Sequence, residues 1–188
     1  MQPNLLKVKS KEKREEFKLR ISGIESGKHL FSINCDNAFF ELAEIPNLQE
    51  GLVKLQIEMD VSDKIITLDF HFKGYVVLPC DRCLDPVNVD LDFEEHLLVK
   101  LMPWIEETEE EDGMWMIDEN TYELDLFHFV YESIALSLPS QILHPDDENG
   151  HPTCDPEILK KLEELTPHEK DTDEIDPRWE ALKNIKQS

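Results

Sequence analysis

Alternation of apolar and polar residues dominates the middle of the chain. From Val53 to Val61 every second residue is apolar, and the same spacing returns in two later runs, 65–78 and 87–101. Since side chains alternate between the two faces of a strand, each run predicts a strand with one apolar face. Short connections favour pairing between neighbours, so we expect an antiparallel meander. Gly74 interrupts the second run and is typical of a bulge.

Shorter elements are predicted on both sides of this meander. Residues 17–21, 30–35 and 114–118 fit short strands, and residues 37–48 fit one helical turn that Pro46 would end. After Leu124 the apolar spacing becomes helical, which predicts an amphipathic helix from Leu124 to about Ser137. Asp125 would lie in its acidic first turn, and Pro139 would end it.

The elements together predict an α+β fold. The expected architecture is an antiparallel meander, or partly open barrel-like sheet, covered by one main helix and followed by an irregular acidic tail with a short helix near 158–165. A length of 188 residues suits one domain with a small appendage. We expect a β-rich domain at 1–140 and an acidic, partly flexible appendage at 141–188.

Charge is distributed unevenly. The formal net charge is −23, yet residues 1–20 hold seven Lys or Arg against three Glu, while residues 104–125 hold ten acids and neither Lys nor Arg. A balance this acidic argues against a protein that coats a nucleic-acid duplex, because phosphates need a positive surface. The acidic runs fit a solvated surface that keeps the protein soluble, or contact with a basic partner.

Hydropathy also bears on location. No apolar run approaches the roughly 20 residues needed to span a bilayer, and the N-terminus lacks an apolar signal core. We therefore expect a cytoplasmic protein with no membrane partner.

The two long alternating runs meet at a cysteine pair. Cys80 and Cys83 lie between Pro79 and Pro86, which cannot donate to a strand ladder, so the stretch is predicted as a hairpin tip. We expect Leu84 to fold back onto the sheet.

Three interpretations of the pair remain open. A redox motif would need a helix N-terminus at the first thiol, whereas strand-like residues follow here. A zinc knuckle fits a hairpin tip better and needs two more ligands. Reduced thiols could also simply pack or shape the turn. If a metal is bound, we expect one zinc, with His144 as a spare ligand and the following set: Cys80, Cys83, His151 and Cys154.

Arrangements typical of catalysis are missing from the sequence. It contains no Gly-rich phosphate loop, no Gly-x-Ser-x-Gly elbow and no His-Glu-x-x-His motif. We expect a non-enzymatic protein without a small-molecule substrate.

Three stretches, in order, resemble one known family. Residues 80–87 (Cys-Asp-Arg-Cys-Leu-Asp-Pro-Val) resemble the central signature of the YceD-like proteins, and residues 124–139 and 176–182 resemble two later stretches. The resemblance covers roughly residues 15–186. Many relatives carry further cysteines after the main helix, as in a zinc ribbon, whereas this chain has Cys154 with nearby histidines.

This resemblance implies a factor for the accumulation, processing or stability of 23S ribosomal RNA. Implied partners are ribosomal RNA, a basic large-subunit ribosomal protein or an assembly intermediate. Two alternatives stay open: an acidic interaction module or adaptor that binds a basic ribosomal protein, and a zinc-stabilised regulatory module. Arg82 could instead pair with Asp81 or Asp85, and Arg178 could cap or bridge near Asp176. The cations compatible with RNA contact are those of the basic segment Lys7–Arg20, chiefly Lys7, Lys9, Lys11, Lys13 and Arg14, together with Lys73, Arg82 and Arg178.

Overall fold

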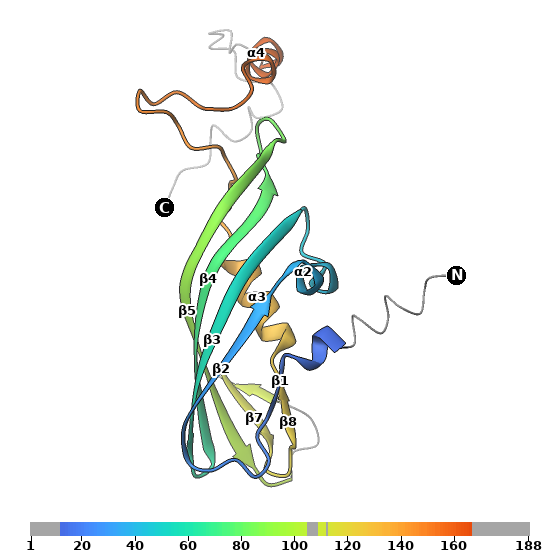
Figure 1. The fold of residues 1–188 in the computed structure, drawn as a ribbon, viewed down its shortest axis with the longest axis vertical. Coiled ribbons are helices and arrows are strands. Elements are labelled where there is room, and N and C mark those ends of the chain that lie inside the picture. The colour runs from blue at the N-terminus through green and yellow to red at the C-terminus, as the bar shows by residue number, and fades with distance from the viewer. Residues whose placement is uncertain (1–11, 105–108, 112, 167–188) are drawn as a thin grey trace, which may run out of the picture.

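The computed structural model of the protein describes residues 12–104, 109–111 and 113–166. Over these residues the chain forms a six-stranded sheet in the order β2-β3-β4-β5-β7-β6, and a separate two-stranded pair of β1 and β8 (Figure 1). The named elements are β1 (Lys18–Arg20), β2 (Gly27–Cys35), α2 (Asn37–Ala43), β3 (Glu50–Ser62), β4 (Ile65–Pro79), β5 (Pro86–Met102), β6 (Glu109–Glu111), β7 (Met114–Asp118), β8 (Glu123–Asp125), α3 (Phe127–Ser137) and α4 (Pro156–Leu165).

The predicted meander is confirmed. Strands β3, β4 and β5 pair antiparallel in one continuous register, in which Val53, Gly74 and Leu91 lie side by side. The prediction of a bulge at Gly74 is therefore wrong. Glycine is needed there for a close approach, because a Cβ atom would lie 2.1 Å from the backbone oxygen of Leu52.

The end of the sheet departs from a simple meander. Strand β7 lies where a strand was predicted, but it pairs parallel to the last residues of β5, from Leu98 to Met102. Strand β2 occupies one edge, so the described sheet is open rather than a closed barrel. The α+β prediction with a mostly antiparallel sheet is confirmed.

The main helix begins later than the sequence suggested. Residues Glu123–Asp125 form β8, which pairs with β1, and α3 begins at Phe127. Strand pairing competes successfully with helix formation here because Leu19 and Leu124 face each other and are both buried. Asp125 accepts a hydrogen bond from the Phe127 backbone N–H at 3.0 Å, so it precedes the helix instead of lying in its first turn.

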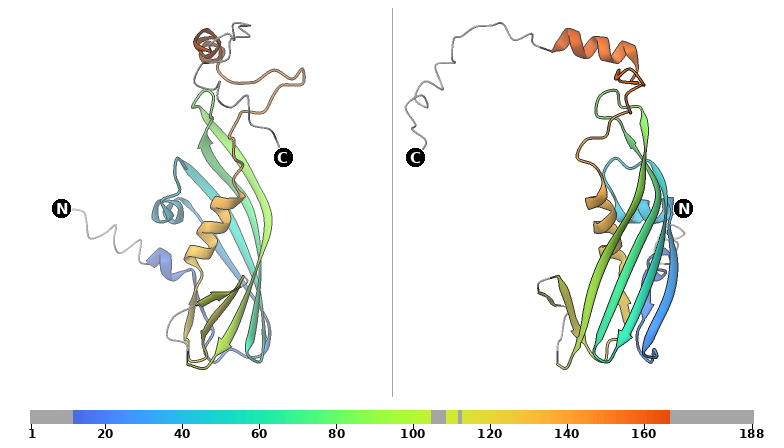
Figure 2. Two further views of the ribbon diagram at one scale, coloured as in Figure 1. Left: turned by 180° about the vertical axis from the view of Figure 1, so that it is seen from behind. Right: turned by 90° about the vertical axis from the view of Figure 1, so that its left-hand side faces the viewer.

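The main core lies between the sheet and α3. Figure 2 shows α3 lying across one face of the sheet. The rings of Phe70 and Phe129 lie 4.7 Å apart between centroids, and Val130 and Ile134 are fully buried. Burial of each such side chain contributes about 1.5–3 kcal/mol before entropy is counted.

Helix α4 lies beyond the tip of the β4–β5 hairpin, at the end of the molecule opposite the β1–β8 pair (Figure 1). Asp155 caps its first turn and Pro156 starts it, which explains why the predicted short helix forms. Unlike α3, it buries none of its side chains fully. No helix among the described residues is long and apolar enough to cross a membrane.

Candidate metal centre at the hairpin tip

The β4–β5 ladder ends where the sequence predicted, with Pro79 opposite Pro86. The Cys80 N–H donates to the Asp85 oxygen at 2.8 Å, and the Leu84 N–H donates to the Cys80 oxygen at 2.9 Å. Leu84 adopts a φ of 65°, and its side chain is 74% exposed. The expectation that Leu84 folds back onto the sheet is wrong, because the left-handed turn directs it away.

The chain after α3 returns to this tip through Asp81. The Asp81 N–H donates to the Ile142 oxygen, and the Ile142 N–H donates to the Asp81 carboxylate, both at 2.7 Å. This reciprocal pair of hydrogen bonds fixes the position of residue 142, which lies two residues before His144. Helix α4 supports the arrangement from the other side, since Ile158 and Leu159 pack against the cysteine cluster.

Four side chains converge at the tip. The ligand atoms of Cys80, Cys83, His144 and Cys154 all lie within 4.8 Å of one another, and the three cysteines are buried. Cys80 Sγ lies 3.7 Å from Cys154 Sγ. His144 Nδ1 lies 3.4 Å from Cys83 Sγ and 3.7 Å from Cys154 Sγ.

These distances match those between the ligand atoms of a tetrahedral zinc site. With zinc–sulfur bonds of about 2.3 Å and zinc–nitrogen bonds of about 2.0 Å, neighbouring sulfurs lie about 3.8 Å apart, and sulfur and nitrogen about 3.5 Å apart. The Cys₃His donor set also suits zinc better than magnesium or calcium, which prefer oxygen ligands. The group can therefore hold a metal, and a site with four protein ligands would be structural.

The surroundings of Cys80 favour a thiolate. Burial alone would raise the pKa of the Cys80 thiol, but hydrogen bonds from the backbone of Cys83 and Arg82 and from His144 lower it to about 6. Burial and the neighbouring Cys80 thiol raise the pKa of Cys83. Since a metal binds thiolates, the tip offers one ligand already deprotonated near neutral pH.

The fourth position of the cluster is occupied by His144 instead of His151. His151 is exposed, and its backbone N–H donates to the Asp147 carboxylate at 2.8 Å. The reason is a small loop closed by pairing between Asp146 and Pro152. Residues on either side of this closure come together, so His144 reaches Cys154 while His151 stays in the loop. The Asn149–Gly150 turn signal could have indicated this closure from the sequence.

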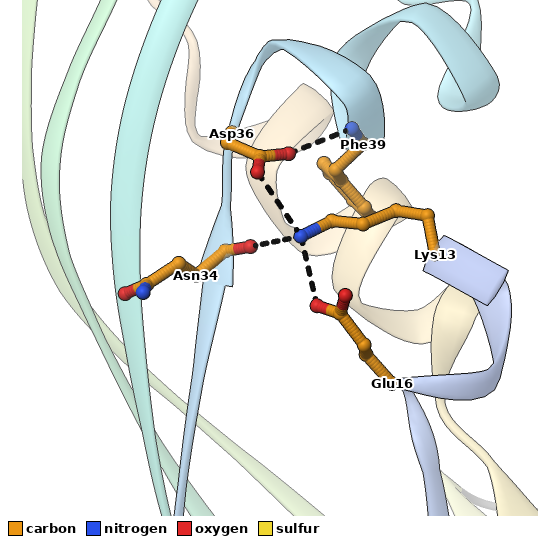
Figure 3. Close-up of polar contacts among 5 residues, drawn as sticks. All are labelled: Lys13, Glu16, Asn34, Asp36 and Phe39. Carbon is orange, nitrogen blue, oxygen red and sulfur yellow. Dashed lines mark hydrogen bonds and ion pairs between the residues drawn. The ribbon is translucent and has the colours of Figure 1, made fainter. Parts of the chain in front are cut away.

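Lys13, one of the cations predicted to contact RNA, is engaged inside the fold (Figure 3). Its ammonium group donates to Glu16 at 2.8 Å, to the Asn34 backbone oxygen at 3.0 Å and to Asp36 at 3.2 Å. Asp36 also accepts from the Phe39 N–H and so caps α2. Because an ammonium group has three N–H donors, Lys13 has none left for a phosphate.

The other cations predicted to contact RNA differ in whether their charged groups already bind another residue. Arg14 pairs with Asp125 at 3.3 Å and lies 5.3 Å from the centre of the Phe127 ring. Lys73 pairs with Asp92 at 2.8 Å on the surface, and that hydrogen bond raises the pKa of Lys73. Arg82 is half-buried beside the cluster, and its guanidinium forms no ion pair with a described residue. Outside the described residues lie Lys7, Lys9, Lys11 and Arg178.

Comparison with known proteins gives this geometry a context. The chain is 26% identical over 153 residues to "Uncharacterized protein YlbN" of Bacillus subtilis (strain 168), an alignment that covers 77% of this chain and 83% of that protein. No solved structure matches the chain significantly. A family model described as "Large ribosomal RNA subunit accumulation protein YceD" matches residues 68–186, which include all four residues of the cluster. Because this match spans more than half of the chain, the protein belongs to the YceD family.

Proposed function

We propose that the protein is a non-enzymatic cytoplasmic factor that supports the accumulation of 23S ribosomal RNA during formation of the large ribosomal subunit. The observation that carries the proposal is the family match over residues 68–186, whose description names accumulation of the large ribosomal RNA and no chemical reaction. The absence of recognisable catalytic motifs agrees with a binding or scaffolding role.

In this proposal the cysteine cluster holds one zinc ion with a structural role. Cys80 and Cys83 come from the hairpin tip, while His144 and Cys154 come from the chain after α3. Zinc would therefore join the β-rich domain to the appendage that we place at 141–188. The appendage needs such a link because α4 buries no side chain of its own. The binding free energy of a structural zinc contributes directly to the folding of the segment that supplies its ligands.

Direct RNA contact is proposed for a smaller set of cations than the sequence suggested. Arg82 is the foremost candidate, since it lies in the family signature and its guanidinium forms no ion pair with a described residue. Lys13 and Arg14 are left out because both already bind groups within the fold. The remaining candidates are Lys7, Lys9, Lys11 and Lys73; Lys73 is kept in spite of its pair with Asp92 because its side chain is 67% exposed, against 44% for Arg14.

Salt titration of RNA binding tests this assignment. Each lost phosphate contact should reduce the magnitude of the slope of log affinity against log salt by roughly 0.7–0.9. Arg82→Gln should lower the slope by that amount, whereas Arg20→Gln, a matched control whose guanidinium lies over the Tyr122 ring, should not. Equal slopes for wild type and Arg82→Gln would remove Arg82 from the interface.

A deletion strain tests the cellular role. Loss of the protein should lower mature 23S RNA relative to 16S RNA, and the wild-type chain should restore the ratio. Cys83→Ser should restore it poorly, whereas the matched control Ser140→Ala, at an exposed site outside the cluster, should restore it fully. An unchanged ratio in the deletion strain, under both fast growth and cold stress, would contradict the proposal.

A further inference from the structure

The face of the sheet opposite α3 contains a hollow across β2, β3, β4 and β5. Two cross-strand rows line it, because the strand register places one residue from each strand at the same level. The hollow has a volume of about 660 Å³. The first row is Leu30, Glu58, Asp69 and His96, and the second is Ser32, Gln56, His71 and Glu94.

The side chains in this hollow favour a cation. Three lining residues are carboxylates, two are histidines, and none is Lys or Arg. Among the described residues, the Glu94 carboxylate has no hydrogen-bond or ion-pair partner, and the Asp69 carboxylate has one partner, His96, at 2.6 Å. Glu58 pairs with Lys28, which is 68% exposed and can turn away into solvent. The hollow therefore offers carboxylate oxygens that an incoming ammonium or guanidinium group can bind.

The dimensions of the hollow suit an extended peptide segment. Four strands at about 4.8 Å spacing give a width of about 14 Å, which four or five extended residues cross. Alternate side chains of such a segment point the same way, so two or three cations would face the sheet. Leu30, 78% exposed on the edge strand β2, gives an apolar contact for the aliphatic stem of Lys or Arg.

We propose that this hollow binds an extended segment rich in Lys or Arg from a protein partner. Charge complementarity selects this occupant, since Glu58, Asp69 and Glu94 would repel the phosphates of RNA. The hollow and the metal cluster lie in different parts of the structure and share no residue. The inference does not rest on the proposed function, because peptide binding can be measured without RNA.

The first experiment measures fluorescence anisotropy of a labelled octapeptide of alternating Arg and Thr, with the purified full-length chain at about 150 mM salt. The hollow variant is Glu58→Gln/Asp69→Asn/Glu94→Gln. Its matched control, Glu148→Gln/Glu163→Gln/Glu164→Gln, removes the same charge at exposed sites in the loop and α4. We expect about tenfold weaker binding for the hollow variant, equal to about 1.4 kcal/mol, and less than twofold for the control.

A second pair of variants adds a positive charge without removing any acid. Gln56 is exposed and lies in the second row of the hollow, and Gln49 is exposed outside it. Gln56→Lys should weaken peptide binding severalfold, whereas Gln49→Lys should leave it nearly unchanged. Circular dichroism should give the same folded spectrum for all four variants, because every substituted side chain lies on the surface.

Three results would overturn the proposal. The first is no measurable binding of the peptide to the wild-type chain. The second is equal weakening by the hollow and control variants, since the peptide would then respond only to the net charge. The third is a dependence of single-stranded RNA binding, but not of peptide binding, on the residues of the hollow. The hollow would then be a binding site for RNA.

Discussion

The β4–β5 hairpin is held by different chemistry at its two ends. In the body of the sheet, Leu68, Phe70 and Phe72 are buried with the side chains of α3 in a large apolar core. At the tip the second buried cluster is small, and three of its four members are the thiols of Cys80, Cys83 and Cys154. The body is thus held by a large apolar core, whereas the segment 141–166 has a small buried cluster and the polar contacts of Asp81, to which our proposal adds a metal.

Two buried thiols make the same contrast. Cys35 lies in the body, and burial raises its pKa to about 12. Cys80 is equally inaccessible, yet N–H donors around the turn lower its pKa to about 6. At Cys80, hydrogen bonds from the backbone of Cys83 and Arg82 and from His144 therefore favour the thiolate, which is the form that binds a metal.

The largest expected loss of stability comes from a substitution in the apolar core of the sheet. Phe70→Ala removes a ring that contacts Phe72 and Phe129, and should lower the free energy of unfolding by about 3–5 kcal/mol. Urea denaturation followed by circular dichroism measures this loss, and Phe70→Leu should lose less. Zinc content per folded chain should stay unchanged, and a parallel loss of zinc would show that the two regions are not independent.

A smaller effect is expected at the edge of the body. Lys13→Ala leaves the Asn34 oxygen and Asp36 without their ammonium partner and should cost about 1–2 kcal/mol in the same urea assay. The value is modest because the carboxylates of Glu16 and Asp36 are about half exposed. Lys18→Ala, which removes a surface pair with Glu15, is the control and should change the free energy of unfolding far less. Equal losses of stability in the two variants would mean that the buried contacts of Lys13 do not stabilise the fold more than a surface ion pair does.

The smallest effect on the body is expected from breaking the tip. Cys154→Ser should shift the unfolding free energy of the sheet by less than about 1 kcal/mol, because the main core does not include Cys154. The same variant should make residues 141–166 sensitive to limited proteolysis, as should a zinc chelator added to the wild type. His151→Ala should remain resistant. Resistance of Cys154→Ser would contradict the view that the cluster anchors this segment.

The body was largely predictable because period-two alternation in long strands fixes both the faces and the register. What the pattern could not show was pairing between distant short segments. The parallel pairing of β7 with β5, and the use of Glu123–Asp125 as a strand, depend on tertiary contacts that no local window contains.

The tip was predictable only in part. The Cys80–Cys83 spacing indicates two ligands by itself, and Cys154 followed as the next cysteine in the chain. Which histidine joins them depends on how the loop between His144 and Cys154 closes, and the His-x-x-Cys spacing, which favours His151, carries no information on that closure. Lys13 looked like a solvated cation because a sequence cannot show that the Asn34 oxygen lies 3.0 Å away.

X-ray absorption at the zinc edge of the full-length protein measures which atoms bind the metal. We expect about one zinc per chain, with three sulfur atoms at about 2.3 Å and one nitrogen at about 2.0 Å. His151→Ala should give the same spectrum, and His144→Ala should lose the imidazole nitrogen. Absence of zinc, or a spectrum of His144→Ala identical to that of the wild type, would contradict the assignment of Cys80, Cys83, His144 and Cys154 as one metal centre.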